Sequence, residues 1–132
     1  MMLDALVKAA LDARLNAVAP YSNFKVGAAL LTQEGKIYTG CNVENATYGL
    51  SVCAERVALW KALSEGERAF SRIAVASDSP RPATPCVACR QLIWEFAGDI
   101  EMLLVNVQGL RESHQLAALF PEAFDRSSLG TT

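Results

Sequence analysis

Two short cysteine-containing clusters constrain this 132-residue chain more than any other feature of its sequence. The first cluster is Cys53-Ala54-Glu55-Arg56, and the second is Pro85-Cys86-Val87-Ala88-Cys89. Together they form the pattern C-x-E…P-C-x-x-C, with 29 residues between the glutamate and the proline. We therefore interpret the rest of the chain as the scaffold and the ligand pocket for one chemical centre.

The spacing within the clusters indicates how three thiols could share a metal ion. Cys86 and Cys89 are three residues apart, so both lie on the same face of one helical turn. Cys53 and Glu55 are about 200° apart around an ideal helix, so both can flank a metal only beyond the helix N-terminus. Two helix N-termini that face one point stabilise thiolates. The sequence predicts Zn²⁺ bound by Cys53, Cys86 and Cys89, with a fourth position left for water, as in catalytic zinc sites.

Three thiolates around Zn²⁺ leave a formal charge of about −1, which makes a bound water less acidic than on a three-histidine zinc. A neighbouring cation should withdraw part of that charge through hydrogen bonds to sulfur. Arg56 is the first candidate because it follows Glu55, and Arg90, which follows the second cluster, is the other candidate.

Other interpretations of the cysteines remain open at this point. The main alternative is a structural zinc site in which Cys41 supplies a fourth thiolate. Against it, Cys41 lies in a strand pattern, where a small buried hydrophobic residue is expected. A redox C-x-x-C motif would leave Cys53 and Glu55 without a role. We assign no role to His114, the single histidine.

Composition excludes several functional classes. The net charge is −2 and no run of lysine or arginine occurs, so we expect a small uncharged ligand and no nucleic-acid partner. No basic leader and no apolar run of about 18 residues is present, so we expect neither secretion nor a membrane span. Four cysteines without a leader favour a reducing compartment, and hence the cytoplasm. At 52% apolar residues, residues 1–132 should form a single domain.

Hydrophobic periodicity predicts an alternation of helices and strands. Helices are predicted over residues 2–18, 53–64, 86–97 and 115–119. Strands are predicted over residues 26–32, 37–41, 73–76, 102–105 and 110–112, and residues 127–132 are expected to be loose. This alternation is typical of an α/β domain with helices on both faces of one mixed sheet.

The motifs together resemble the small homotetrameric cytidine deaminases that bind zinc through three cysteines. The two clusters match a signature shared by zinc deaminases of many bases. The loop Asn42-Val43-Glu44-Asn45 and the segment Tyr21-Ser22-Asn23-Phe24-Lys25-Val26-Gly27-Ala28-Ala29 make the resemblance more specific, and it extends from about Tyr21 to Phe124. The resemblance implies a three-layer α/β/α sandwich with a mixed five-stranded sheet, and one Zn²⁺ per subunit.

The resemblance also implies a role for each matching residue. Glu55 would take a proton from the zinc-bound water, pass it to N3 of cytosine and later protonate the leaving ammonia. Arg56 would partly neutralise the three thiolates that bind zinc. Asn42 and Glu44 would hydrogen-bond the sugar 3′-hydroxyl, and Phe24 would pack against the base. Considered without the resemblance, Phe24 fits the core equally well, and the other two fit a solvated loop better.

Three further residues complete the implied substrate site: Ala46, Tyr48 and Phe124. In the family, the positions that match Tyr48 and Phe124 reach the sites of neighbouring subunits, which implies a homotetramer. Two departures from the family pattern are Val87, where glycine is usual, and Phe120, where leucine is usual. Val87 could make the start of the helix at the second cluster tighter.

The activity implied is that of a hydrolase: zinc-dependent deamination of cytidine and 2′-deoxycytidine to uridine and 2′-deoxyuridine plus ammonia, in pyrimidine salvage. Two alternatives within the same fold are deamination of another aminopyrimidine nucleoside and deamination of a base in tRNA. The absence of a basic run disfavours tRNA. A non-catalytic zinc module with four cysteines is the alternative from a different class.

Overall fold

The computed structural model of the chain describes residues 2–129. Its elements are, in order, α1 (Met2–Arg14), β1 (Val26–Thr32), β2 (Ile37–Cys41), the 3₁₀ helix η1 (Tyr48–Leu50), α2 (Ala54–Ser64), β3 (Phe70–Ser77), α3 (Val87–Ala97), β4 (Glu101–Asn106), β5 (Arg111–Gln115), α4 (Leu116–Leu119) and the 3₁₀ helix η2 (Arg126–Leu129). The predicted alternation of helices and strands is confirmed.

The five strands form one mixed sheet in the order β2-β1-β3-β4-β5. The central pair, β3 and β4, is parallel, and the other three pairs are antiparallel. The connection between the parallel strands runs through α3, as a βαβ crossover requires. The C-terminal ends of β3 and β4 therefore lie at the same edge of the sheet.

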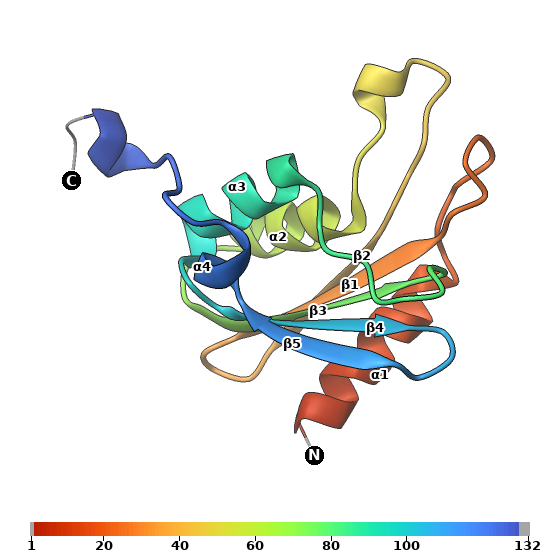
Figure 1. Cartoon of the computed structure of the whole chain (residues 1–132), viewed down its shortest axis with the longest axis horizontal. Helices are drawn as coiled ribbons and strands as arrows, with labels where there is room; N and C mark the ends of the chain where they lie inside the picture. The colour runs from red at the N-terminus through yellow and green to blue at the C-terminus, as the bar shows by residue number, and fades with distance from the viewer. Residues whose placement is uncertain (1, 130–132) are drawn as a thin grey trace.

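Helices cover both faces of this sheet, so the predicted three-layer α/β/α sandwich is confirmed (Figure 1). Side chains alternate between the two faces along β1: Ala28 and Leu30 pack with α2 and α3, whereas Ala29 and Leu31 pack with α1. The same alternation along β3 and β4 explains why these two strands are apolar at consecutive positions, because both of their faces are buried.

The ends of several elements differ from the prediction. α1 ends at Arg14 rather than near residue 18: the N–H groups of residues 15–17 bond three residues back, as in a tight turn, and the N–H of Val18 donates to the carbonyl of Asn42. β3 extends from Phe70 to Ser77, since pairing with β1 orders residues on both sides of its apolar centre. Of the tail that was expected to be loose, residues 127–129 lie in η2, and residues 130–132 lie outside the described residues.

Two glycines allow helices to approach the sheet closely on opposite faces. A Cβ built on Gly27 would overlap the carbonyl oxygen of Ala10 and the backbone nitrogen of Arg14 in α1. A Cβ on Gly40 would lie 2.6 Å from the carbonyl oxygen of Ala54 and 2.6 Å from the backbone nitrogen of Ala58 in α2. In each case the obstacle is helix backbone, which cannot move aside as a flexible side chain could.

We expect Gly27→Ala to lower the free energy of unfolding by at least about 2 kcal/mol, because the added methyl group must displace α1 from the sheet. Gly49→Ala is the matched control, since a Cβ at Gly49 meets no other atom within 4 Å. Its effect should stay within about 0.5 kcal/mol. Urea unfolding followed by circular dichroism measures both variants. If both variants changed the free energy of unfolding equally, the close contact between α1 and β1 at Gly27 would not contribute to stability.

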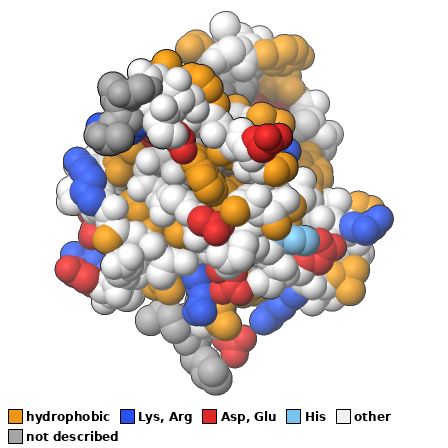
Figure 2. All heavy atoms as spheres, turned by 60° about the vertical axis from the view of Figure 1, so that its left-hand side comes forward, with side chains coloured by type: hydrophobic (Ala, Val, Ile, Leu, Met, Phe, Trp, Pro, Cys, Tyr) orange, Lys and Arg blue, Asp and Glu red, His pale blue; other side chains and the backbone are white. Residues whose placement is uncertain are grey.

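The charged side chains on the surface are mixed in sign. On the face shown in Figure 2, lysine and arginine lie scattered among aspartate and glutamate. Such a surface gives the phosphates of a polynucleotide no continuous basic stripe on that face. Within residues 2–129, none of the helices has the length and apolar character needed to cross a lipid bilayer.

Candidate metal centre and its pocket

Two helix N-termini bring three thiols to one point. Cys53 is the N-cap residue of α2 and Cys86 is the N-cap residue of α3, both with extended backbone conformation. Cys89 lies in the first turn of α3 and is fully buried. The three sulfur atoms all lie within 4.8 Å of one another. The arrangement beyond the N-termini that the Cys53 and Glu55 spacing predicted is therefore present.

The donor set fits a zinc ion. Thiolates at about 2.3 Å from a tetrahedral Zn²⁺ are separated by about 3.8 Å from one another. The Sγ atom of Cys86 is 4.0 Å from that of Cys53 and 3.3 Å from that of Cys89, on either side of this value. Among residues 2–129, the metal-ligand cluster contains these three cysteines and not Cys41, which is half-buried on β2. The four-cysteine alternative is therefore wrong.

Arg56 is the cation beside the sulfur atoms. Its Nη2 donates to the Sγ of Cys53 at 3.6 Å. A hydrogen bond from Cys89, together with the nearby Arg56 charge, lowers the pKa of Cys53 to about 5. The same contact between the sulfurs and burial raise the pKa of Cys89. Arg90, the second candidate, is used elsewhere: its Nη1 donates to the carbonyl of Leu119.

Glu55 lies in the first turn of α2, next to the cluster, and only 5% of its surface is exposed. Burial raises the pKa of Glu55 to about 7, because a carboxylate loses its hydration there. A carboxyl group with a pKa near neutrality can both accept and donate a proton at physiological pH. Glu55 therefore has the properties of a general acid and base within reach of the thiol cluster.

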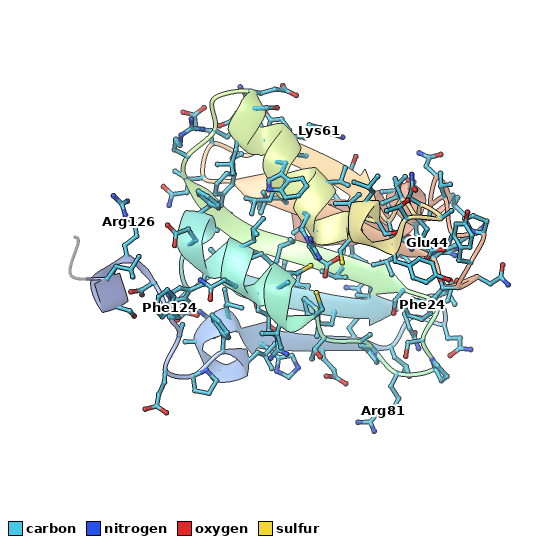
Figure 3. The ribbon with its side chains drawn as sticks, turned by 90° about the horizontal axis from the view of Figure 1, so that it is seen from above. Phe24, Glu44, Lys61, Arg81, Phe124 and Arg126 are labelled. Carbon is cyan, nitrogen blue, oxygen red and sulfur yellow. The ribbon has the colours of Figure 1, made fainter. Side chains whose placement is uncertain are left out.

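A pocket of about 470 Å³ opens over the cluster. Cys53, Glu55 and Cys86 line the inner part of this pocket, and Phe24, which precedes β1, lines the outer part. Its remaining walls include Asn42, Glu44, Tyr48, Val75, Thr84 and Pro85. Figure 3 shows that Phe24 and Glu44 lie at the same end of the molecule. The volume suits a ligand of small-molecule size.

The residues that line the outer part of the pocket are fixed by hydrogen bonds to the backbone. The Oδ1 of Asn42 accepts the N–H of Val26, and its Nδ2 donates to the carbonyl of Phe24, both at 2.8 Å. Asn42 is only 9% exposed, so a solvated loop is the wrong description of it. The Oε1 of Glu44 accepts the N–H groups of Tyr21 and Ser22.

Three residues predicted to belong to the substrate site, Ala46, Tyr48 and Phe124, are exposed in the single chain. Tyr48 lines the pocket but is 74% exposed, and Ala46 is exposed and is not part of the pocket wall. Phe124 is 57% exposed and lies at the opposite end of the molecule from Phe24 (Figure 3). Val87 is 62% exposed on the first turn of α3 and does not line the pocket.

One pocket residue that makes several hydrogen bonds was not predicted from the sequence. Ser22 lines the pocket, and its hydroxyl donates to the Oε2 of Glu44 at 2.5 Å. Its position between Tyr21 and Asn23, inside a motif already singled out, was the available signal. A serine in a loop has no distinctive pattern of its own, and its partner lies 22 residues further along the chain.

Comparison with known proteins identifies what the chain is similar to. The model of the family described as the cytidine and deoxycytidylate deaminase zinc-binding region matches residues 2–105. A cytidine deaminase of Sporosarcina psychrophila is 45% identical over 130 residues, 98% of this chain and 96% of the relative. One of Halalkalibacterium halodurans is 49% identical over 120 residues, 90% of this chain and 91% of the relative. The crystal structure of a cytidine deaminase from Burkholderia pseudomallei has a TM-score of 0.91 and 50% identity, with 94% of this chain and 100% of that chain covered.

Proposed function

Since the chain belongs to the zinc-binding family of cytidine and deoxycytidylate deaminases, we propose that it hydrolyses cytidine and 2′-deoxycytidine to uridine and 2′-deoxyuridine, with release of ammonia. One observation carries this proposal. A single pocket contains the thiols of Cys53 and Cys86, the buried carboxyl of Glu55, and an outer part with an aromatic ring and a carboxylate suited to a nucleoside.

Zinc bound by Cys53, Cys86 and Cys89 would supply a Lewis acid that makes water a competent nucleophile near neutral pH. Arg56 keeps negative charge from accumulating on the sulfur atoms through its contact with Cys53. This compensation matters because each thiolate donates charge that would otherwise weaken the Lewis acid.

Glu55 carries the proton transfers. Its carboxylate accepts a proton from the attacking water and delivers it to N3 of the pyrimidine ring. It then accepts the proton that remains on the oxygen now bonded to C4 and delivers it to the C4 amino group, which leaves as ammonia as the C4–N bond breaks and the C4 carbonyl forms. A pKa of about 7 supports both directions of transfer, because neither protonation state is strongly disfavoured.

The outer part of the pocket selects a neutral nucleoside. The Phe24 ring is available for packing against the base, and the amide of Asn42 and the carboxylate of Glu44 for the sugar 3′-hydroxyl. A phosphate group on the sugar would meet the carboxylate of Glu44 in this outer part, which disfavours nucleotides. A hydroxyl group offers Glu44 a hydrogen without adding charge.

We also propose that the chain acts as a single domain within a homotetramer in the cytoplasm and serves pyrimidine salvage. Tyr48 and Phe124 are exposed aromatic side chains in the single chain, and an interface between subunits would bury them. Ala46, also exposed, would lie beside Tyr48 at the edge of a neighbouring site.

The test of this function is a substrate panel followed by ultraviolet absorbance. We expect purified zinc-loaded protein to deaminate cytidine and 2′-deoxycytidine, with kcat/KM for cytidine monophosphate and for cytosine lower by at least about 100-fold. Dialysis against a zinc chelator should abolish the activity, and added Zn²⁺ should restore it. Activity on none of the four by the zinc-loaded protein would contradict the proposal, and turnover of another aminopyrimidine nucleoside would redirect it.

A further inference from the structure

The Ser22 hydroxyl connects two parts of the pocket. It donates its hydrogen to the Oε2 of Glu44 at 2.5 Å, and its oxygen accepts the backbone N–H of Phe24 at 3.0 Å. One side chain therefore contacts both the carboxylate and the backbone of the aromatic residue. These two groups come from different segments, the loop before β1 and the loop after β2.

The bridge spans a sharp turn of the backbone just before Phe24. Asn23 adopts a left-handed conformation with φ of 57°, which is uncommon for a residue other than glycine and which asparagine tolerates better than most. The chain therefore turns sharply between Ser22 and Phe24. The hydrogen bond from the Phe24 N–H to the Ser22 hydroxyl closes this turn, and the Asn42 amide fixes the Phe24 carbonyl on the other side.

The hydrogen-bond capacity of Glu44 is nearly used up inside the protein. An ionised carboxylate offers about four acceptor positions. The N–H groups of Tyr21 and Ser22 occupy Oε1, and the Ser22 hydroxyl occupies one position on Oε2. About one acceptor position on Oε2 therefore remains for a ligand. The same contacts lower the pKa of Glu44, so the carboxylate stays an acceptor.

We propose that Ser22 is a positioning residue. Its hydroxyl orients the single free acceptor position of Glu44 toward the sugar, and it holds the Glu44 carboxylate at a fixed position relative to Phe24. This inference rests on the proposed function, in which Glu44 binds the sugar 3′-hydroxyl. Without the Ser22 hydroxyl, the N–H groups of Tyr21 and Ser22 still hold Oε1, but the carboxylate can rotate about that atom and the direction of Oε2 is less fixed. A ligand hydroxyl must then order the Oε2 atom itself, which weakens binding.

The test compares cytidine with 3′-deoxycytidine, which lacks the hydroxyl that Glu44 is proposed to bind. We expect Ser22→Ala to raise KM for cytidine by about tenfold, as for one hydrogen bond to a charged group, with kcat changed by less than about threefold. The loss of kcat/KM should be at least about fivefold larger for cytidine than for 3′-deoxycytidine. Ser22→Thr, which keeps a hydroxyl, should recover most of the loss.

Two further variants separate positioning from a general effect on the fold. Ser113→Ala removes another serine–glutamate hydrogen bond, from Ser113 to Glu101 at 2.6 Å on β5 and β4, and should leave both substrates unaffected. In a Glu44→Gln background, Ser22→Ala should cause little additional loss, because the two side chains act as one unit.

The outcomes distinguish this inference from the proposed function. Equal losses on cytidine and 3′-deoxycytidine, or full additivity with Glu44→Gln, would overturn the role of Ser22 and leave the deaminase activity intact. A wild-type protein that does not deaminate cytidine would overturn the proposed function and this inference with it.

Discussion

Replacement of Glu55 by glutamine is expected to lower kcat/KM for cytidine by at least about 10³-fold while one zinc ion per chain is retained. Glutamine preserves the size of the buried side chain, so the packing at the start of α2 should persist. It cannot exchange a proton, and the water, the ring N3 and the leaving amino group would all lose their proton carrier. The free energy of unfolding should not fall, because the amide removes an ionisable group from a buried position.

Steady-state kinetics and metal analysis of the same preparation test this expectation together. Glu65→Gln is the matched control, since Glu65 lies at the other end of α2 and is exposed, and it should retain wild-type kinetics. A Glu55→Gln protein that has lost its zinc would show that the carboxyl supports the metal centre itself. Residual activity within about tenfold of the wild type would assign the proton transfers to another group.

The second large effect concerns the metal. Cys89→Ala is expected to reduce bound zinc to well below one ion per chain and to abolish activity, because two thiolates hold zinc much more weakly than three. The melting temperature should also fall, since zinc binds the folded state and its binding free energy contributes to stability. The added cavity at a fully buried position acts in the same direction.

Cys41→Ala provides the control for this experiment, because Cys41 is also a cysteine without a disulfide but lies outside the thiol cluster. It should retain one zinc per chain and its catalytic activity. Metal analysis by mass spectrometry and a thermal melt of both variants decide the question. Loss of zinc from Cys41→Ala, or its full retention by Cys89→Ala, would contradict the three-cysteine assignment.

Much of the fold could be predicted because its signals are local. The two faces of the sheet follow from consecutive apolar residues in β3 and β4, and the helices follow from their periodicity. The predicted ends of helices and strands were wrong where contacts with distant parts of the chain determine them. Val18, predicted in the first helix, instead pairs with the chain near Asn42, and no pattern within the helix shows that partner.

The sequence by itself determined the chemistry of the centre. The three thiols, the carboxyl of Glu55 and the guanidinium of Arg56 fall at spacings that a helix N-terminus converts directly into geometry, because a helical turn has a fixed rise and rotation. This local regularity fixes the geometry within each cluster, whereas the meeting of the two clusters was predicted from their match to the zinc-deaminase signature.

Only the tertiary structure decided how the pocket around this centre is completed. It excluded Cys41 from the metal cluster, directed Arg90 to the carbonyl of Leu119, and joined Ser22 to Glu44 across 22 residues of sequence. These contacts depend on the way the helices and loops pack against the sheet. Side chains that meet through such packing carry no spacing rule in the sequence, so their partners become known only once the chain is folded.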